Sequence, residues 1–313
     1  MRVFVAGAGG ALGRRLVPAL IQAGHTVGAF TRSERKRKPL MQLGATVFIA
    51  DALNAVAVNE AVEAFRPEVI VNQLTAIPQQ LDIRHLDREF ALTNRLRIEG
   101  NDNLLAAGAK VGVVKFLSQS YAGWPYERVG SWVKGEDDPL DQDPPHGLRE
   151  SLKAIKHLET AVLTKCSGDG IVLRYGSFYG PGTSVSKGGF LVDEVKKRRL
   201  PIVAGGTGVW SFVHIDDAAS ATVAALQGKP GIYNVADDDP APVHIWIPFL
   251  AELLGAKPPR HIEAWLARPL IGEHGVVMMR DTRGASNEKA KRELGWTPAY
   301  PSWRDGFRKE LTA

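Results

Sequence analysis

Three glycines near the start of the chain have the spacing of a phosphate-binding turn. Gly7, Gly10 and Gly13 stand three residues apart between a short β-branched run and a helical pattern. In such a turn the first glycine permits a tight bend, the second lets the main chain approach a diphosphate, and the third lets helix and strand pack closely. Amides at the start of the helix then face the phosphates. The pattern predicts dinucleotide binding by Gly7, Gly9, Gly10, Ala11, Leu12 and Gly13.

The end of the second expected strand indicates which dinucleotide binds. A site for NAD has a carboxylate there, which takes both ribose hydroxyls. In this chain the strand ends at Thr31 and is followed by Arg32 and Ser33. A guanidinium holds a 2′-phosphate through charge-assisted hydrogen bonds. The sequence therefore favours NADP(H) over NAD, with Arg14 as a second candidate cation; a solvated basic surface is the alternative reading of Arg32.

Short apolar runs alternate with helical patterns over the first two thirds of the chain. Strands that are apolar on both sides and separated by helices imply a parallel sheet covered on both faces. We therefore expect an α/β fold, a doubly wound parallel sheet of the Rossmann type, with a smaller, mostly C-terminal substrate lobe. The expected strands are Val3–Ala6, Thr26–Thr31, Thr46–Ala50, Val69–Gln73, Val113–Ser118, Ile171–Arg174 and Ile232–Val235, and the expected helices include Ala11–Ala23, Glu34–Leu43, Ala55–Phe65 and Asp87–Ala107.

Length and composition limit the remaining possibilities. We expect a dinucleotide-binding domain over residues 1–183, to which residues 212–240 return, and a substrate-binding lobe over residues 184–211 and 241–313. No apolar run approaches the roughly 20 residues of a membrane span, and no targeting segment is evident. The single cysteine, Cys166, excludes an intramolecular disulfide and fits a cytoplasmic location. The net charge of +5 is weak support for nucleic-acid binding.

Further motifs carry a resemblance to a known family. They are Asp51 after the third strand, NQLTA at 72–76, Thr93-Asn94, LSQS at 117–120, RYGSFYGPG at 174–182, FVHIDD at 212–217 and YNV at 233–235. With these motifs the chain resembles the short-chain dehydrogenase/reductase superfamily, and within it the extended NAD(P)-dependent epimerase/dehydratase type. The likeness covers nearly the whole chain. It implies a nicotinamide-dependent enzyme that acts on a small molecule.

The resemblance also implies roles for individual residues. Asp51 and Leu53 would contact the adenine. Ser118 and Ser120 would stand at the end of the active-site strand, where the Ser120 hydroxyl meets a substrate oxygen. The other implied cofactor contacts are Leu74, Thr75 and Ala76 along the ribose and diphosphate, Tyr175, Gly176, Ser177 and Phe178 along the nicotinamide, and also Asn94 and Ser118.

One feature of the family is missing from this chain. Family members use a tyrosine as acid/base, and a lysine one helical turn later lowers the pKa of its phenol. The helix that should carry this pair reads RESLKAIKHLETAVL and contains no tyrosine. Alignment on Glu159 puts Ser151 and Ile155 at the two positions. Alignment on Lys156 puts Leu152 in place of the tyrosine, and Lys156 could then still hold the nicotinamide ribose.

Another residue would have to supply the missing phenol. Tyr121 directly follows Ser120, at the expected mouth of the active site, and is the first candidate. A phenol with its ordinary pKa near 10 can protonate an oxyanion unaided. The alternatives are Tyr126, Tyr179 and His146, because a histidine also donates protons near neutral pH.

The sequence therefore predicts an NADP(H)-dependent oxidoreductase-type enzyme that transfers hydride to or from a small-molecule carbonyl or hydroxyl, with a non-standard acid/base. Two alternatives stay open: a catalytically silent NADP(H)-binding sensor, and an enzyme like the sugar-nucleotide epimerases and dehydratases. We expect no metal site, because no histidine pair has ligand spacing with a supporting acid. No nucleic-acid or membrane partner is expected, and a homodimer is an open option.

Overall fold

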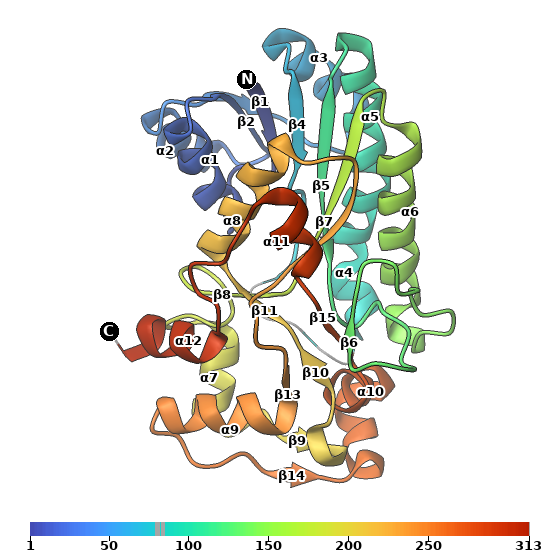
Figure 1. Cartoon of the computed structure of the whole chain (residues 1–313), viewed down its shortest axis with the longest axis vertical. Helices are drawn as coiled ribbons and strands as arrows, with labels where there is room; N and C mark the ends of the chain where they lie inside the picture. The colour runs from blue at the N-terminus through green and yellow to red at the C-terminus, as the bar shows by residue number, and fades with distance from the viewer. Residues whose placement is uncertain (79–81, 83–84, 313) are drawn as a thin grey trace.

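The computed structural model describes residues 1–78, 82 and 85–312. Seven parallel strands form one sheet in the upper half of the molecule (Figure 1). The chain starts in the middle of this sheet and winds outward in both directions, so the prediction of a doubly wound α/β fold is confirmed. In spatial order the strands are β12 (Gly231–Val235), β7 (Asp169–Tyr175), β5 (Lys115–Tyr121), β4 (Val69–Asn72), β1 (Arg2–Ala6), β2 (Thr26–Thr31) and β3 (Thr46–Ile49).

Helices cover both faces of the sheet, because its strands are apolar on both sides. In β1, Val3 faces one hydrophobic core and Phe4 the other. The first core includes residues of α1 (Gly13–Gln22) and α8 (Ile215–Ala224), and the second includes residues of α3 (Ala55–Phe65), α5 (Asn101–Val111) and α6 (Arg149–Lys165).

A third hydrophobic core lies below the sheet (Figure 1). Its largest fully buried side chains are those of Trp246, Trp303, Tyr179, Phe212 and Phe307. The helices around it are α7 (Phe190–Lys196), α9 (Val243–Leu253), α10 (Ala264–Arg280) and α12 (Trp303–Thr312). Short strand pairs complete this half: β8 (Ser177–Tyr179) with β11 (Phe212–His214), β9 (Ile202–Val203) with β14 (His261–Ile262), and β10 (Val209–Trp210) with β13 (Ala241–Pro242).

The long helix expected over 87–107 is present, but it contains one π-helical turn and extends beyond the expected end. The structure has α4 (Leu86–Arg95), one π-helical turn (Leu96–Gly100) and then α5, which ends at Gly112 with a positive φ of 73°. Gly108 therefore lies inside the helix and does not end it. A Cβ on Gly108 would stand 3.1 Å from Cδ1 of Ile70, so this glycine lets α5 pack closely on the sheet.

Two other limits also differ from the expectation. The predicted helix over 34–43 begins as a 3₁₀ turn (Glu34–Lys36), and α2 covers only Arg37–Gln42. The fifth strand continues to Tyr121, because Gln119–Tyr121 pair with the end of β7. The segment after β5, rich in Gly, Pro and Asp, is expected from its composition to be a long loop, but it is not all loop. It contains β6 (Val133–Lys134), which pairs with β15 (Gly284–Ala285) just before α11 (Glu288–Leu294).

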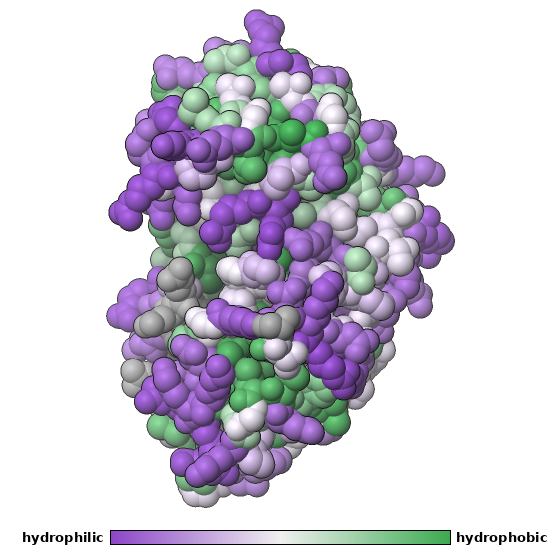
Figure 2. Space-filling view, turned by 90° about the vertical axis from the view of Figure 1, so that its left-hand side faces the viewer, coloured by the Kyte–Doolittle hydropathy of each residue, from purple (hydrophilic) through white to green (hydrophobic). Residues whose placement is uncertain are grey.

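The outer surface is mixed in character. On the side shown in Figure 2, hydrophilic residues cover much of the face and hydrophobic ones gather in patches between them. Within the part of the chain that the structure describes, none of the helices combines the length and the hydrophobicity needed to cross a membrane.

Candidate functional site

The glycine turn after β1 has the shape that dinucleotide binding requires. Gly7 has a φ of +86°, and a Cβ there would lie 2.4 Å from the carbonyl oxygen of Gln73. A Cβ on Gly13 would lie 2.5 Å from the carbonyl oxygens of Gly7 and Ala8, so this glycine fixes the approach of α1 to β1. No side chain caps α1, and its first turn holds no acid. The positive end of the helix dipole is therefore open to an anion.

A cavity of about 180 Å³ opens beside this turn. Eight of the predicted cofactor residues line it: Gly7, Gly9, Gly10, Arg32, Ser33, Asp51, Leu74 and Thr75. The residues that complete the wall are Phe30, Thr31, Lys36, Ala50, Ala52, Gln73, Leu92 and Leu96. Backbone from the ends of β1, β2, β3 and β4 thus meets at one place, where open α/β sheets bind their ligands. The cradle fits the adenosine and diphosphate of a nicotinamide dinucleotide.

The far end of this cavity is basic. The Arg32 side chain is exposed and has no hydrogen-bond or ion-pair partner among the described residues. Lys36 lies beside it in the wall. Glu34 is the acid nearest in sequence, and its carboxylate is held by Arg37 at 2.5 Å, outside the lining. Two cations therefore remain available for an anionic group at the adenosine ribose.

The other predicted cofactor residues lie outside this lining. Ala11, Leu12 and Gly13 lead into α1, and Leu53 follows Asp51, whose Oδ1 accepts the Leu53 amide. The Ala76 amide donates to Oγ1 of Thr93 on α4. Tyr175 is 1% exposed, and its hydroxyl contacts Oγ1 of Thr222 at 2.6 Å, inside the first core. Gly176 joins β7 to β8, and Ser177 and Phe178 are the first two residues of β8.

Buried polar groups gather at the carboxyl ends of β4 and β5. Asn72 donates through Nδ2 to Asn101 Oδ1 and Ser118 Oγ, at 2.9 and 3.2 Å. Ser120 donates to Oε1 of Glu159 at 2.7 Å. The same carboxylate receives two bonds from the guanidinium of Arg174, at 2.8 and 2.6 Å. Both predicted serines therefore lie at this edge, and Ser120 is held by a buried ion pair.

The phenols differ in their surroundings. Tyr121 is half-buried, its hydroxyl lies 2.9 Å from Oγ of Ser177, and burial raises its pKa. Tyr126 is fully buried and donates to Asn234, and burial raises its pKa to about 12. Tyr179 lies in the third core, while His146 is exposed. Among these four alternatives, Tyr121 is the one on the strand that carries Ser120.

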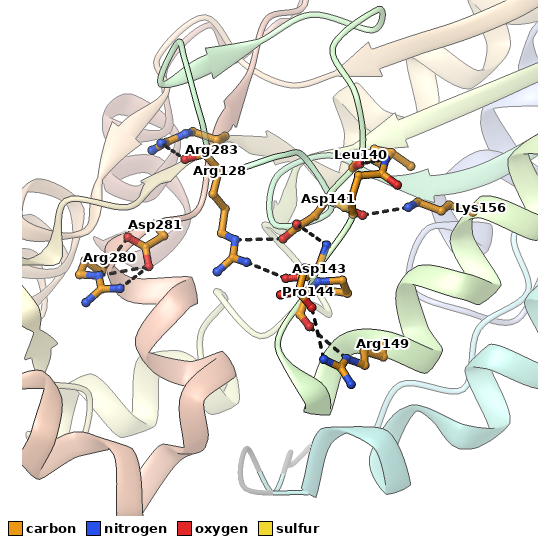
Figure 3. A network of polar contacts seen from close by, with 11 residues as sticks. Arg128, Leu140, Asp141, Asp143, Pro144, Arg149, Lys156, Arg280, Asp281 and Arg283 are labelled. Atoms are coloured by element: carbon orange, nitrogen blue, oxygen red, sulfur yellow. Dashed lines mark hydrogen bonds and ion pairs between the residues drawn. The ribbon is translucent and has the colours of Figure 1, made fainter.

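The helix expected to carry the tyrosine–lysine pair is α6. Ser151, Leu152 and Ile155 on it are all buried. Ser151 Oγ accepts Nδ2 of Asn94, which ties α6 to α4. Lys156 instead reaches the loop before α6 and donates to the carbonyl oxygen of Asp141 at 2.8 Å (Figure 3). The catalytic roles of Ser120, Tyr121 and Lys156 stay predictions.

Sequence reasoning missed part of the site. The wall residues Leu92 and Leu96 come from α4 and the π turn, whose apolar pattern looks like that of any packed helix. The pairing of Glu159 with Arg174 was also missed, although both residues were within recognised motifs. Fifteen positions separate them, so only the fold brings them together.

The comparisons with known proteins agree with this geometry. The model of the "NAD dependent epimerase/dehydratase family" matches residues 3–236. The chain belongs to this family, and it is an NAD(P)-dependent enzyme.

One relative resembles the chain over its whole length: a "3-diazoavenalumate denitrifying reductase" from a Streptomyces species, 43% identical over 312 residues, which are 99% of this chain and 100% of that protein. A "4-hydroxy-2-methyl-3-oxo-4-farnesyl-3,4-dihydroquinoline-1-oxide ketoreductase" from Stigmatella aurantiaca is 24% identical, with 95% of this chain and 92% of the other covered.

Solved structures share the fold. The UDP-glucose 4-epimerase of Thermus thermophilus, in complex with NAD, has a TM-score of 0.75 at 24% identity, covering 100% of this chain and 98% of the other. The UDP-glucose 4-epimerase of Thermotoga maritima, with UDP-glucose, has a TM-score of 0.77 at 22% identity and the same coverage.

Proposed function

We propose that this protein is an NADPH-dependent reductase whose substrate accepts hydride without needing a proton from the enzyme. The acceptor class that fits best is an arenediazonium compound, which loses its nitrogen as N2. The observation that carries the proposal is the composition of α6, which contains no tyrosine and whose Ser151, Leu152 and Ile155, the residues at the aligned positions, are all buried.

The chemistry of a diazonium explains why such a pair is dispensable. When bound, NADPH supplies a hydride that forms a C–H bond at the ring carbon, while the C–N bond breaks and its electron pair leaves with N2. The ring carbon is reduced and the nicotinamide is oxidised. No oxyanion forms, so no proton moves. A carbonyl substrate, in contrast, needs a proton donor, whose removal typically lowers the rate by about 10²–10⁴-fold.

The relative that is 43% identical supports this substrate class, because its name describes a reductase that denitrifies a diazo compound. An epimerase must oxidise and reduce the same carbon and depends on the family's tyrosine and lysine. In this chain, Ser151 and Ile155 cannot exchange a proton with a sugar hydroxyl as a tyrosine–lysine pair does, so the epimerase alternative is less well supported.

The basic end of the cavity supports NADPH as the coenzyme. Arg32 and Lys36 line the wall, and no carboxylate follows β2 directly. Charge-assisted bonds from a guanidinium match a 2′-phosphate. The structurally similar epimerase of Thermus thermophilus was solved with NAD, so this part of the proposal needs its own test.

The experiment offers the purified protein 4-carboxybenzenediazonium and NADPH that carries deuterium on C4 of the nicotinamide. The expected products are benzoate with deuterium at the ring carbon that bore nitrogen, one N2 and one NADP⁺ per turnover. Mass spectrometry of the benzoate measures the transfer.

The controls are a protein-free mixture, because diazonium ions decompose in water, and a second assay with UDP-glucose. NADPH oxidation at the protein-free rate, or benzoate that takes its new hydrogen from water, would refute the proposal. Epimerised UDP-glucose would support the sugar-nucleotide alternative, and NADPH binding without any turnover would support the sensor.

A further inference from the structure

The segment of α4, the π turn and α5 that contacts α6 carries a buried arginine without a hydrogen bond or ion pair to any described residue. Arg97 lies in the π turn and is only 7% exposed. No hydrogen bond or ion pair joins its guanidinium to any residue that the structure describes. Burying an unpaired charge is costly, because the protein interior solvates it poorly. Burial lowers the pKa of Arg97 to about 10, and the carboxylate of Glu159 opposes this shift.

The neighbouring acid is already engaged. Glu159 receives two bonds from Arg174 and one from Ser120, so both of its oxygens have partners. Arg174 and Arg97 are both buried, and Glu159 is the single carboxylate that interacts with each of them. Glu159 therefore accepts hydrogen bonds from Arg174 and Ser120, and none from Arg97.

Two asparagines on the same helical segment have unused hydrogen-bonding atoms. Asn94 precedes Arg97 by three residues and Asn101 follows it by four, a spacing that places all three near one face of a helix. Asn94 Oδ1 and Asn101 Nδ2 are buried and have no partner. The other polar atom of each side-chain amide is hydrogen-bonded. Asn94 Nδ2 donates to Ser151 on α6, and Asn101 Oδ1 accepts bonds from Asn72 and Ser118 at the strand ends.

This face is separate from the wall of the dinucleotide cavity. Leu92 and Leu96 line that cavity, whereas Arg97 does not. Leu96 and Arg97 are consecutive residues of the π turn, so their side chains point in different directions. Glu159, the electrostatic neighbour of Arg97, accepts the Ser120 hydroxyl near the end of β5, where the proposed function expects the reacting part of a substrate.

We propose that Arg97 binds an anionic oxygen of the substrate, a carboxylate in particular, near the carboxyl ends of β4 and β5. The inference rests on the proposed function for the location of the substrate, and it adds that the substrate is an acid. A bidentate carboxylate would satisfy the guanidinium, and its partly buried setting makes such a bond strong.

The test is a binding measurement, independent of turnover. Benzoate and benzamide are titrated by calorimetry into the protein saturated with NADP⁺. Since a charge-assisted hydrogen bond contributes about 1.5–3 kcal/mol, wild-type protein should bind benzoate at least about tenfold more tightly than benzamide. Arg97→Met should remove this preference, and Arg97→Lys should keep part of it.

Arg95→Met is the matched control. Arg95 lies two residues away, is exposed and pairs with Glu99 at 2.7 Å, so its loss should leave benzoate affinity unchanged. Because an unpaired buried charge is unfavourable, Arg97→Met should not lower the thermal midpoint of the ligand-free protein.

Three results would overturn the inference. The first is a wild-type protein that binds benzoate and benzamide equally, which does not depend on any variant folding. The second is an Arg97→Met protein with a lowered midpoint and an intact preference for benzoate, which would make the arginine structural. The third is a loss of NADPH affinity larger than the loss for benzoate, which would assign the cation to the coenzyme. A failure of hydride transfer with benzoate binding intact would instead refute the proposed function alone.

Discussion

Under the proposed function, coenzyme choice depends on single residues at the basic end of the cavity. Arg32 lies in the wall without a partner among the described residues, so its charge is available to a ligand. Replacing Arg32 with Glu should raise the dissociation constant for NADPH by roughly 10–100-fold, because charge-assisted bonds of about 1.5–3 kcal/mol are lost. NADH lacks the 2′-phosphate and should change little. Quenching of protein fluorescence by each coenzyme measures both constants.

Arg35→Glu is the control for this prediction. It makes the same change of charge three residues farther along, at an exposed side chain outside the cavity wall. The variant should change the dissociation constant for NADPH only slightly, and this change should decrease as the salt concentration rises, as expected for a distant charge. Equal losses of NADPH and NADH in the Arg32 variant would contradict the assignment of the 2′-phosphate.

Tyr121 tests whether the reaction needs a proton. Burial raises the pKa of Tyr121, so its phenol stays protonated through the neutral range and can only donate. With 4-carboxybenzenediazonium, Tyr121→Phe should keep turnover within about threefold of wild type, since hydride transfer to a diazonium consumes no proton. A fall of about 10²–10⁴-fold would instead identify a general acid, as the sequence predicts. The NADPH affinity of the variant should be unchanged and serves as the folding control.

Between elements, one buried ion pair joins α6 to the sheet. Glu159 on α6 and Arg174 on β7 are 5% and 3% exposed, and they share two hydrogen bonds. The bond from Ser120 adds β5 to this contact. Because the pair lies directly under the carboxyl edge of the sheet, it positions the strand that carries both candidate residues, Ser120 and Tyr121.

Replacing one member of this ion pair should lower the free energy of unfolding more than replacing both members. Glu159→Gln leaves a buried guanidinium without its counter-charge and should lower the free energy of unfolding by about 3–5 kcal/mol. The double variant Glu159→Leu/Arg174→Met should lose less than the single one. Urea unfolding measures both. Glu150→Gln, at an exposed position on the same helix, should stay within about 0.5 kcal/mol of wild type.

At the scale of the whole molecule, the sheet and the third core are joined by chain that passes between them several times. His214 and Asp217, at the start of α8, both contact one of these connecting segments. The Asp217 carboxylate accepts the amides of Ala299 and Tyr300, at 2.8 and 2.9 Å, and the His214 ring stacks on Tyr300 at 3.9 Å. The two residues thus bind the same segment, Ala299 and Tyr300, which precedes α12.

Asp237 marks a second crossing, where the chain leaves β12. Its side chain is 1% exposed, its Oδ2 has no partner, and burial raises its pKa well above the ordinary value. The charged form is therefore penalised in the folded state only. This penalty is absent below the unfolded pKa of about 3.9 and grows as the pH rises toward the folded pKa.

Asp237→Asn should accordingly stabilise the protein more at pH 8 than at pH 5. The gain expected at pH 8 is about 1–3 kcal/mol, the usual cost of an unsatisfied buried polar group. Urea unfolding at the two pH values measures it, with Asp137→Asn at an exposed loop position as control. A gain of equal size at both values would show that the carboxyl does not titrate in this range.

The sequence predicted the sheet domain well because its signals are local. Strands β1, β2 and β7 lie within about three residues of the expected limits. The sequence also predicted why Gly7 and Gly13 are glycines, since a Cβ at either position would clash with nearby backbone atoms. The π turn was not predictable, since Leu96–Gly100 continue an ordinary helical pattern and the extra residue is set by packing against α6 and the sheet. The end of β5 at Tyr121 depended likewise on pairing with β7.

By itself the sequence determined the fold class, the phosphate-binding turn and the absence of the tyrosine from α6, because these depend on residue types and short spacings. Only the tertiary structure decided that Lys156 turns toward the loop at Asp141, that Glu159 is occupied by Arg174 and Ser120, and that Arg97 is left buried beside them. The physical reason is that the partners of a charged side chain come from distant segments, and which of them meet depends on how helices and strands pack, which local pattern does not encode.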